Sequence, residues 1–341
     1  MISPRDFWQL AFAGLAYPYL AVTCVILSLY WLIRRYWSIA ILFAVILVAG
    51  WNVHRTFWGF GWANAPLDDP KARFSVMSYN VRLFDLYNWT ENKQTRNEIF
   101  HFLSNEKPDI ICFQEFYYDD RKEYFNTRDT LTSILNTSHF SELYTHNIHD
   151  VKYFGLCTFS KFPITDQGNI SFGNDPNNAV LWTDIAIGDD TVRIFNAHLA
   201  SIRFQKADYA SIGDRSGEEL YRQKPDGEQR IIPRLRDAFA KRASQSIKLA
   251  EAISKSPHRV IVCGDFNDTP VSYAYKTIGR GLRDAHKESG SGMGNTYIGK
   301  FPSFRIDYIF HSPELHSHGY VTHPEELSDH RAISCWIDIP N

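Results

Sequence analysis

The chain has 341 residues, enough for one large domain or two ordinary ones, and its 44% hydrophobic and 22% charged content is close to the globular average. Residues 1–73 hold six of the 36 Lys and Arg and three of the 38 Asp and Glu, so the remainder carries 30 basic against 35 acidic side chains. This balance argues against a protein that tracks along nucleic acid. It does not exclude a nuclease, because bound metal ions supply positive charge inside an acidic site.

Two long apolar runs open the sequence. From residue 7 to 33 the only ionisable side chains are those of Tyr and Cys, and from 37 to 53 one serine and one asparagine interrupt the run. Each run is close to the roughly 20 residues that cross a bilayer core, and aromatic residues lie near the ends of both. Both exceed the apolar core of a signal peptide, and no small-residue cleavage site follows. The sequence predicts a transmembrane hairpin over residues 1–57, with spans at about 8–32 and 37–57; a buried soluble hairpin is the alternative.

The orientation of this hairpin follows from its charges. Arg34 and Arg35 fill the short loop between the runs, whereas Arg5 stands beside Asp6 at the N-terminus. The excess of positive charge on cytoplasmic loops then places the loop in the cytoplasm and both termini outside. Three basic residues between 55 and 73 weaken this argument. We expect a two-span membrane protein whose main domain is extracytoplasmic.

A juxtamembrane linker rich in Gly, Trp, Asn, Pro and Asp is expected over residues 58–72, followed by a single large domain over 73–341 with a polar insert at about 201–233. Short apolar runs predict strands at 74–80, 108–115, 155–160, 179–185, 191–199, 260–265, 305–310 and 328–337. Helices are expected at 95–105, 124–135 and 235–254, the last with Phe239, Ala243, Ile247 and Ala250 on its buried face. Many short strands with few helices predict two packed sheets with helices outside, not a parallel βαβ array. The five scattered cysteines are expected to be buried free thiols.

The stretch Val260–Asn267 combines an apolar strand with two polar residues. Asp265 and Asn267 stand two apart, so in an extended chain their side chains emerge on the same side. Carboxylate and amide oxygens suit a hard cation such as Mg²⁺. A strand that closes in an Asx turn explains the same residues structurally.

Similar polar residues recur where the expected strands end. Each alone has a structural explanation, such as a turn cap for Asn or a solvated end for Glu. Nine of them together are hard to explain as independent accidents. They are Asn80, Glu115, Asn196, His198, Asp265, Asn267, Asp307, Asp329 and His330.

The order of these segments resembles the endonuclease/exonuclease/phosphatase superfamily, which includes deoxyribonucleases, apurinic endonucleases, inositol-polyphosphate phosphatases and neutral sphingomyelinases. The resemblance covers about residues 74–339, and with the apolar hairpin it is similar to membrane-anchored bacterial members. It implies a four-layer α/β (α+β) sandwich of two mainly antiparallel sheets flanked by helices, with the active site at one end. The motifs that carry it are Ser78–Asn80, Phe113–Glu115, Asn196–Leu199, Gly264–Asn267, Arg305–Ile309 and Ser328–His330.

The resemblance also implies the ligands of the metal site. Glu115 matches the principal Mg²⁺ ligand, with Asn80 beside it, and Asp329 matches a further acid of the site. One Mg²⁺ or two are both compatible with these motifs, and Mn²⁺ is an alternative ion.

The catalytic residues are implied in the same way. Asp265 and Asn267 match the pair that orients the attacking water, and Asp307 matches the partner of His330. His198 matches the histidine near the phosphate and the leaving group. Asn196, His198 and Asn267 would contact the phosphate of the substrate.

The expected function is a membrane-anchored, Mg²⁺-dependent phosphoesterase that hydrolyses a phosphodiester or phosphate ester by in-line attack of water. The short linker keeps the domain near the bilayer, which favours a lipid-linked substrate. An anchored nuclease acting on DNA or RNA is the alternative within this fold. A catalytically silent binding module is the alternative of another class, and the complete set of site residues argues against it. The insert at 201–233 is either a lid that grips a phosphate headgroup or a solvated loop. No protein partner is predicted.

Overall fold

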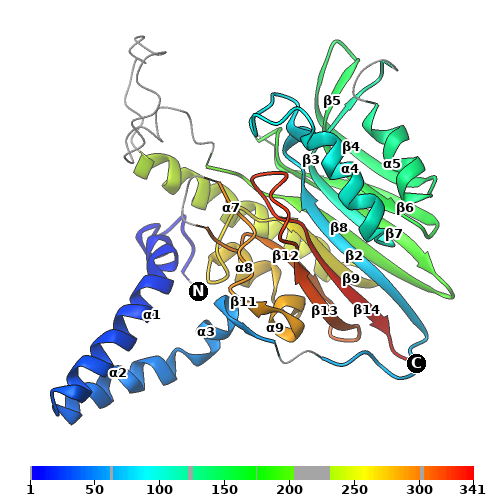
Figure 1. The fold of residues 1–341 in the computed structure, drawn as a ribbon. Helices are drawn as coiled ribbons and strands as arrows, with labels where there is room; N and C mark the ends of the chain where they lie inside the picture. Colours follow the sequence, from blue (N-terminus) through cyan, green and yellow to red (C-terminus); the bar gives the residue numbers. More distant parts are fainter. Residues whose placement is uncertain (1, 62–63, 122–125, 174, 203–230, 300–302) are drawn as a thin grey trace, which may run out of the picture.

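The computed structural model describes residues 2–61, 64–121, 126–173, 175–202, 231–299 and 303–341 (Figure 1). The expected insert at 201–233 lies almost wholly outside these ranges. The described residues form two six-stranded sheets, flanking helices, and a group of N-terminal helices that extends away from the sheets (Figure 1).

The first sheet is mixed. Its central neighbours β2 and β3 are parallel, and its four other neighbouring pairs are antiparallel. The strand order is β13 (His316–Thr322), β14 (Ile333–Ile339), β2 (Ala72–Asn80), β3 (Ile110–Asp119), β5 (Lys152–Ser160) and β4 (His139–Ile148).

The second sheet repeats this plan, with one parallel pair, β8 and β9, among antiparallel neighbours. The strand order is β10 (Arg283–Asp284), β12 (Asp307–His311), β9 (Arg259–Asp265), β8 (Asp190–His198), β7 (Ala179–Ile187) and β6 (Ile164–Ser171). In both sheets the parallel pair therefore occupies a central position.

Three large apolar cores, and a small fourth cluster, hold together the layers of the described part of the chain. In β3, Ile110 and Cys112 face the core between the sheets, whereas Ile111 and Phe113 face helices α4 (Thr95–Glu106) and α5 (Thr127–Leu135). Strands buried on both faces read as continuous apolar runs rather than as alternating ones, which explains why these segments were recognisable in the sequence. The third core lies between the second sheet and the helices α7 (Ile231–Ser254) and α8 (Tyr273–Ile278).

The buried face of α7 differs from the predicted one. Phe239 and Ala243 are buried as expected, but Ile247 is 43% exposed and Leu249 is fully buried in its place. The true face continues through Arg242 and Ser246, at helical spacings of three and four residues. Three polar residues of α7, Arg242, Gln245 and Ser246, are buried, and they obscured the buried face of the helix in the sequence.

The N-terminal runs form three helices: α1 (Gln9–Ile33), α2 (Trp37–Ala49) and α3 (Trp51–Phe57). Only α1, among the described residues, is by itself long and apolar enough to cross a membrane. The predicted second span at 37–57 is not one straight helix: α2 and α3 are long and apolar enough only together, and they are bent by 62° relative to one another at Gly50. The span therefore stays a prediction. A side chain at Gly50 would come within 3.2 Å of Tyr17 Oη, so a residue without a side chain permits this close bend.

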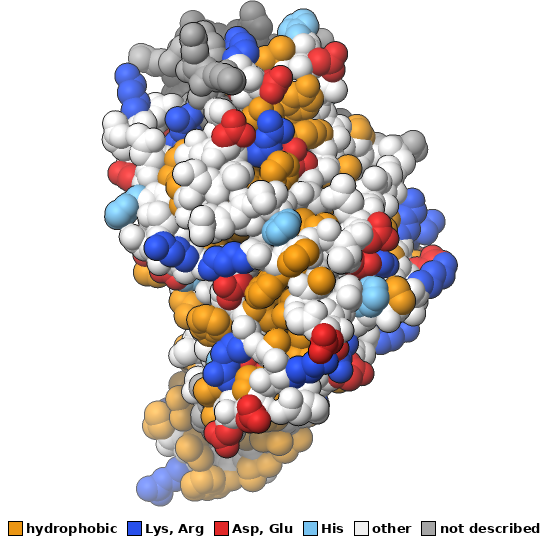
Figure 2. All heavy atoms as spheres, turned by 90° about the vertical axis from the view of Figure 1, so that its right-hand side faces the viewer, with side chains coloured by type: hydrophobic (Ala, Val, Ile, Leu, Met, Phe, Trp, Pro, Cys, Tyr) orange, Lys and Arg blue, Asp and Glu red, His pale blue; other side chains and the backbone are white. Residues whose placement is uncertain are grey.

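The first and last of these helices contact the main domain. The ring of Phe12 lies 5.5 Å from that of Phe239 on α7, and a methyl group on Gly14 would lie 3.2 Å from Val271 Cγ2. After α3, the short strand β1 (Gly59–Phe60) pairs with β11 (Ser291–Gly292), which follows the short helix α9 (Ala285–Ser289). The outer parts of α1 and α2 leave large hydrophobic side chains exposed, and Figure 2 shows them gathered at the lower end of the molecule.

Candidate active site

The predicted site residues converge at one end of the sandwich. Asn80 is the last residue of β2, and His198 and Asp265 are the paired last residues of β8 and β9. Strands that run parallel end at the same edge of a sheet. The parallel pair in each sheet therefore brings its polar residues to the same edge. Asp307 begins β12, opposite Asp265, and His330 precedes β14, so the antiparallel neighbours bring their first residues to the same place.

Asp265 is the centre of this group and is 1% exposed. Its Oδ2 accepts hydrogen bonds from Asn80 Nδ2 at 3.1 Å and from Asn267 Nδ2 at 3.0 Å, and its Oδ1 accepts one from the Asn267 amide at 2.8 Å. Both His198 Nε2 and His330 Nε2 lie 3.7 Å from Asp265 Oδ2. The side-chain amides of Asn80 and Asn267 thus fix the Asp265 carboxylate by hydrogen bonds, with the two histidine rings nearby.

The surroundings of Asp265 disfavour its charged form. Burial raises the pKa of Asp265 to about 8, and repulsion from Asp307 acts in the same direction. Attraction to His330 and the hydrogen bonds from Asn267 and Asn80 lower the pKa, but they do not cancel the cost of burial. A carboxyl group with a pKa near neutrality is suited to accept and release a proton during catalysis.

His330 and Asp307 form a buried pair. His330 Nδ1 lies 2.9 Å from Asp307 Oδ2, and the main-chain amide of Asp307 donates to Thr296 Oγ1 at 3.1 Å. Burial alone would lower the pKa of His330, but the charges of Asp307 and Asp265 outweigh it and hold that pKa well above its ordinary value. The pair therefore keeps the imidazole protonated and fixes its orientation.

Glu115 owes its position to a break in strand β3. The predicted strand ended here, whereas β3 continues to Asp119 after a bulge between Phe113 and Phe116. Glu115 has a φ of +49°, a left-handed conformation that is uncommon for a residue with a side chain. The bulge turns the carboxylate toward the site, where Glu115 Oε1 lies 3.4 Å from Asn80 Nδ2 and 3.8 Å from His198 Nε2.

Asp329 stands beside Glu115 and completes the acidic part of the site. Burial raises the pKa of Glu115, and the charge of Asp329 raises it further. Arg82 Nε lies 3.4 Å from Asp329 Oδ2, and Ser328 Oγ donates to the Asn80 carbonyl at 2.8 Å, which ties this loop to the end of β2. Glu115 and Asp329 keep 35% and 24% of their side-chain surface open to solvent.

Two groups of residues could hold a cation. The ligand atoms of Asp265, Asp307 and His330 lie within 4.8 Å of one another. However, Asp307 is hydrogen-bonded to His330, and Asp265 already accepts three hydrogen bonds, so few of their lone pairs remain for a cation. Glu115 and Asp329 are partly exposed to solvent, and the negative charge of Asp329 raises the pKa of Glu115. A hard divalent cation between the two carboxylates would relieve this repulsion. Their oxygen atoms fit such an ion better.

Asn196 has partners other than a phosphate. It is fully buried, and its Nδ2 donates to the carbonyls of Phe113 and Cys157 at 3.1 Å each, while its Oδ1 accepts from Gln114 Nε2 at 2.8 Å. Asn196 thus joins the two sheets beneath the site. The predicted phosphate contact stays a prediction, and this arrangement does not favour it.

The segment after β2 contributes residues that the sequence did not reveal. Arg82–Asp85 have φ values between +42° and +56°, a run of left-handed residues that is costly for residues with side chains. This turn places the guanidinium of Arg82 4.5 Å from the ring centre of Trp89, while the same side chain contacts Asp329. Tyr87 and Trp89 are 61% and 42% exposed and form an aromatic rim beside the acidic residues.

Comparison with known proteins agrees with this geometry. The model of the "Endonuclease/Exonuclease/phosphatase family" matches residues 77–330, which is most of the chain. The chain belongs to this family. Members of the family are metal-dependent phosphodiesterases and nucleases, and the protein is accordingly an enzyme that hydrolyses phosphoric ester bonds with a divalent metal. A second model, described as a domain of unknown function, matches residues 1–57.

Solved structures share the fold of this family member at low identity. A family protein from Bacteroides thetaiotaomicron has 16% identity and a TM-score of 0.58, over 80% of this chain and 100% of that one. Truncated TDP2 from Caenorhabditis elegans has 20% identity and a TM-score of 0.53, over 80% and 100%. The catalytic domain of human Nocturnin, solved with a bound sulfate anion, has 20% identity and a TM-score of 0.53, over 80% and 95%. No curated protein matches the chain.

Proposed function

We propose that the protein is a membrane-anchored, Mg²⁺-dependent phosphoesterase that hydrolyses a lipid-linked phosphodiester or phosphate ester by in-line attack of water. The proposal that the protein hydrolyses a phosphoester rests on the buried carboxylate of Asp265. Asn80 and Asn267 donate hydrogen bonds to this carboxylate, and His198 and His330 lie on either side of it. In-line attack requires a base, groups that position the water and positive charge around the phosphoryl oxygens, and these side chains are suited to supply each of them.

Each residue has a defined part in the proposed reaction. Asp265 accepts the proton of the water whose oxygen bonds to phosphorus, and Asn267 positions that water. His330, kept protonated by Asp307 through Nδ1, would donate one hydrogen bond from Nε2 to the phosphoryl group. As the water oxygen bonds to phosphorus, the bond from phosphorus to the leaving oxygen breaks; that oxygen departs with the electron pair, close to His198, and takes up a proton from solvent. These groups are fixed by strand ends rather than by long loops, so little reorganisation accompanies the reaction.

The divalent ion would be held by Glu115, Asp329 and Asn80. When bound, it neutralises the negative charge that develops on the phosphoryl oxygens. The bulge at Glu115 turns its carboxylate into the site, and Arg82 orients Asp329 without occupying all of its oxygen positions.

A lipid-linked substrate is supported by the place where α1 meets the domain. A methyl group on Gly14 would lie 3.2 Å from Val271 Cγ2 and 3.7 Å from Thr269 Oγ1, and Thr269 follows Asn267 by two residues. The apolar helix therefore packs on the loop that leaves the site. If α1 lies in a bilayer, as we propose, the site stands close to the membrane surface, with the domain on the extracytoplasmic side.

One observation favours a nuclease as the second candidate. The exposed rings of Tyr87 and Trp89 lie with centroids 5.0 Å apart, and Arg82 packs over Trp89. Exposed aromatic rings beside an arginine are a common platform for unpaired bases. The same rim could also contact the apolar part of a lipid.

The deciding experiment offers several substrates to the full-length protein in detergent with Mg²⁺. Plasmid DNA, a sphingomyelin-like diester and polyprenyl pyrophosphate are assayed in parallel, with His198→Ala as the test variant and His101→Ala, which alters an exposed helical histidine, as its control. We expect turnover of a lipid substrate that is lost in His198→Ala and kept in His101→Ala. Rapid nicking of DNA without lipid turnover would overturn the lipid assignment, and equal activity in both variants would overturn the role of His198.

A further inference from the structure

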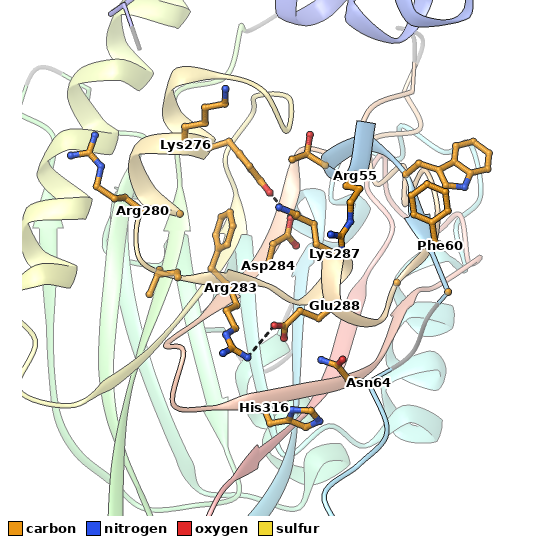
Figure 3. Close-up of a pocket in the computed structure, with 18 residues that line it drawn as sticks. Arg55, Phe60, Asn64, Lys276, Arg280, Arg283, Asp284, Lys287, Glu288 and His316 are labelled. Carbon is orange, nitrogen blue, oxygen red and sulfur yellow. Dashed lines mark hydrogen bonds and ion pairs between the residues drawn. The ribbon is translucent and has the colours of Figure 1, made fainter. Parts of the chain in front are cut away.

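A cavity of about 950 Å³ lies where the end of α3 and strand β1 meet α8, β10 and α9 (Figure 3). None of the residues that line it belongs to the candidate active site. In the second sheet, Phe310 on the wall of this cavity is three residues along β12 from Asp307, which corresponds to roughly 10 Å of strand. We call this cavity the junction pocket, and it is a second concave site that the hydrolytic mechanism does not use.

The junction pocket is lined by more basic than acidic side chains. Arg55 comes from α3, Lys276 from α8, Lys287 from α9, and Arg280 and Arg283 from the segment between α8 and α9. Figure 3 shows these five residues arranged around the opening from different sides. The fold, and not a run in the sequence, brings these five basic residues to one cavity; in Figure 3 Arg55, Arg283 and Lys287 lie around its middle, and the ends of Lys276 and Arg280 lie at its outer edge.

The two acids of the junction pocket already have partners. Asp284 accepts from Arg305 Nη1 at 3.1 Å, Arg305 Nη2 at 2.8 Å and Tyr275 Oη at 2.7 Å. Glu288 accepts from Ser317 Oγ at 2.7 Å and pairs with His311 at 3.0 Å. The charge of Asp284 is therefore neutralised by Arg305, and Glu288 already has hydrogen-bond partners behind the pocket wall.

The basic side chains, by contrast, are mostly unpaired. Arg283 contacts Glu288 at 3.4 Å. Within the described ranges, Arg55, Lys276, Arg280 and Lys287 make no side-chain hydrogen bond or ion pair, and all four are exposed. Four cations around one cavity repel each other, and an anion bound between them would remove that repulsion and accept several charge-assisted hydrogen bonds.

The wall that carries Arg55 is firmly attached to the domain. Arg305 Nη2 donates to the Thr56 carbonyl at 2.7 Å in a buried position, and β1 pairs with β11. A side chain on Gly59 would come within 2.3 Å of the Gly290 carbonyl oxygen, so β1 approaches α9 as closely as a glycine allows. Rigid walls lower the entropic cost of holding a small anion.

We propose that the junction pocket binds a phosphate-bearing anion as a site separate from the catalytic centre. The size of the cavity and its unpaired Arg and Lys side chains suit one phosphate group with its substituent. The phosphate can come from a lipid headgroup or from solution. A headgroup is supported by Trp58 and Phe60, which line the pocket and are 51% and 43% exposed directly after the apolar helices, as aromatic residues at a membrane interface are. The proposal does not depend on the substrate of the active site.

The test measures thermal unfolding of the full-length protein in neutral detergent with EDTA. Three proteins are compared: wild type, Lys276→Gln/Lys287→Gln, and the control Lys93→Gln/Lys248→Gln, which removes the same charge from exposed positions outside the pocket. Each is titrated with dihexanoyl-phosphatidylglycerol, inorganic phosphate and dihexanoyl-phosphatidylcholine. We expect a saturable rise in Tm for wild type and control, and an apparent Kd weaker by roughly tenfold or more in the pocket variant.

The outcomes separate the sources of the anion. A rise with phosphatidylglycerol alone identifies a lipid headgroup, and an equal rise with inorganic phosphate identifies a free phosphate site. Binding of phosphate at the catalytic centre would appear equally in all three proteins and so does not affect the comparison. No saturable rise in wild type, or the same apparent Kd in the pocket variant and the control, would overturn the proposal. Loss of hydrolysis in an active-site variant would not bear on the proposal that the junction pocket binds an anion.

Discussion

Replacing Asp265 with Asn should remove activity and, in the absence of metal, raise stability. The substitution keeps the shape of the side chain but removes the group proposed to accept a proton from water. We expect kcat to fall by about 10²–10⁴-fold, the range for loss of a general base. Stability should move the other way, because burial makes the charged carboxylate unfavourable in the folded protein.

The magnitude follows from linkage between protonation and folding. The pKa of Asp265 is about 8 in the folded protein against 3.8 for an ordinary aspartate side chain, so between these two pH values the folded state keeps a proton that the unfolded state releases. Stability therefore falls as pH rises, by about 1.4 kcal/mol per unit, and the loss reaches about 4 kcal/mol at pH 7. An amide avoids this cost but replaces one acceptor oxygen near Asn80 and Asn267, which costs about 1 kcal/mol. The net gain at pH 7 is about 3 kcal/mol.

Thermal unfolding of the full-length protein in detergent with EDTA measures this gain. We expect Asp265→Asn to raise Tm by roughly 5–10 °C at pH 7 and by much less at pH 5. Asp237→Asn is the control, because the side chain of Asp237 is 61% exposed, and it should change neither Tm nor activity. A shift in Tm that is the same at pH 5 and pH 8 would refute the ionisation argument. Activity equal to wild type would refute the catalytic assignment.

Three further predictions test other parts of the molecule. Arg305→Leu should destabilise the protein by about 3–5 kcal/mol in urea unfolding, because it leaves Asp284 buried without its cation; a loss below 1 kcal/mol would contradict this. Trp89→Ala should raise KM for single-stranded DNA roughly tenfold or more with kcat unchanged if the rim binds bases, whereas an unchanged KM would count against the nuclease. Mg²⁺ should bind more tightly at pH 7.5 than at pH 5.5 by calorimetry, because the raised pKa of Glu115 lets protons compete with the ion, and Glu115→Gln should abolish this pH dependence.

The strands that carry the site could be predicted because they are buried on both faces. Runs such as Ile110–Phe113 have no solvent-facing residue, so their hydrophobicity alone marks them. Strands β4, β6 and β13 were absent from the prediction. Strand β6 is exposed or half-buried along its whole length and contains Asp166, Gln167 and Asn169, so it reads as a polar loop until β7 provides its hydrogen bonds. Four of the five cysteines are buried free thiols, as predicted for these strands, while Cys24 is only partly buried.

The geometry of the site depended on backbone features that composition does not encode. Glu115 was expected at the end of a strand, but it lies inside β3 at a bulge with a positive φ. No glycine or asparagine at this position signals the left-handed conformation. Asp307 and His330 likewise lie at or before the start of a strand, so their closeness follows from the antiparallel pairing of β12 and β14 with their neighbours.

In the N-terminal region the sequence predicted the apolar segments but not how the helices are arranged. Hydrophobicity identified both apolar runs, but it could not reveal the 62° bend at Gly50, because the bend depends on contacts with other elements. His54 Nδ1 lies 3.0 Å from Tyr17 Oη and its Nε2 lies 3.0 Å from the Leu47 carbonyl, so one polar side chain joins α1, α2 and α3. Thr56 and Phe57 are buried against the domain. This contact holds α3 at an angle to α2, so that the two helices do not form one straight helix.

The arrangement of parallel and antiparallel pairs explains why one end of the sandwich can hold so many polar groups. A sheet that is antiparallel throughout would send neighbouring carboxyl ends to opposite edges, and Asn80 and Glu115 would then be a strand length apart. The parallel pairs β2–β3 and β8–β9 place the strand ends Asn80, His198 and Asp265, together with the bulge of β3 at Glu115, at one edge. The packing of the two sheets brings the pairs face to face. Asn80 on one sheet then reaches Asp265 on the other at 3.1 Å. A slip of one residue in the pairing of β2 with β3, or of β8 with β9, would move the side chains of the slipped strand to the opposite face of the sheet. The core between the sheets, which fixes this pairing, therefore also fixes which side chains point into the active site.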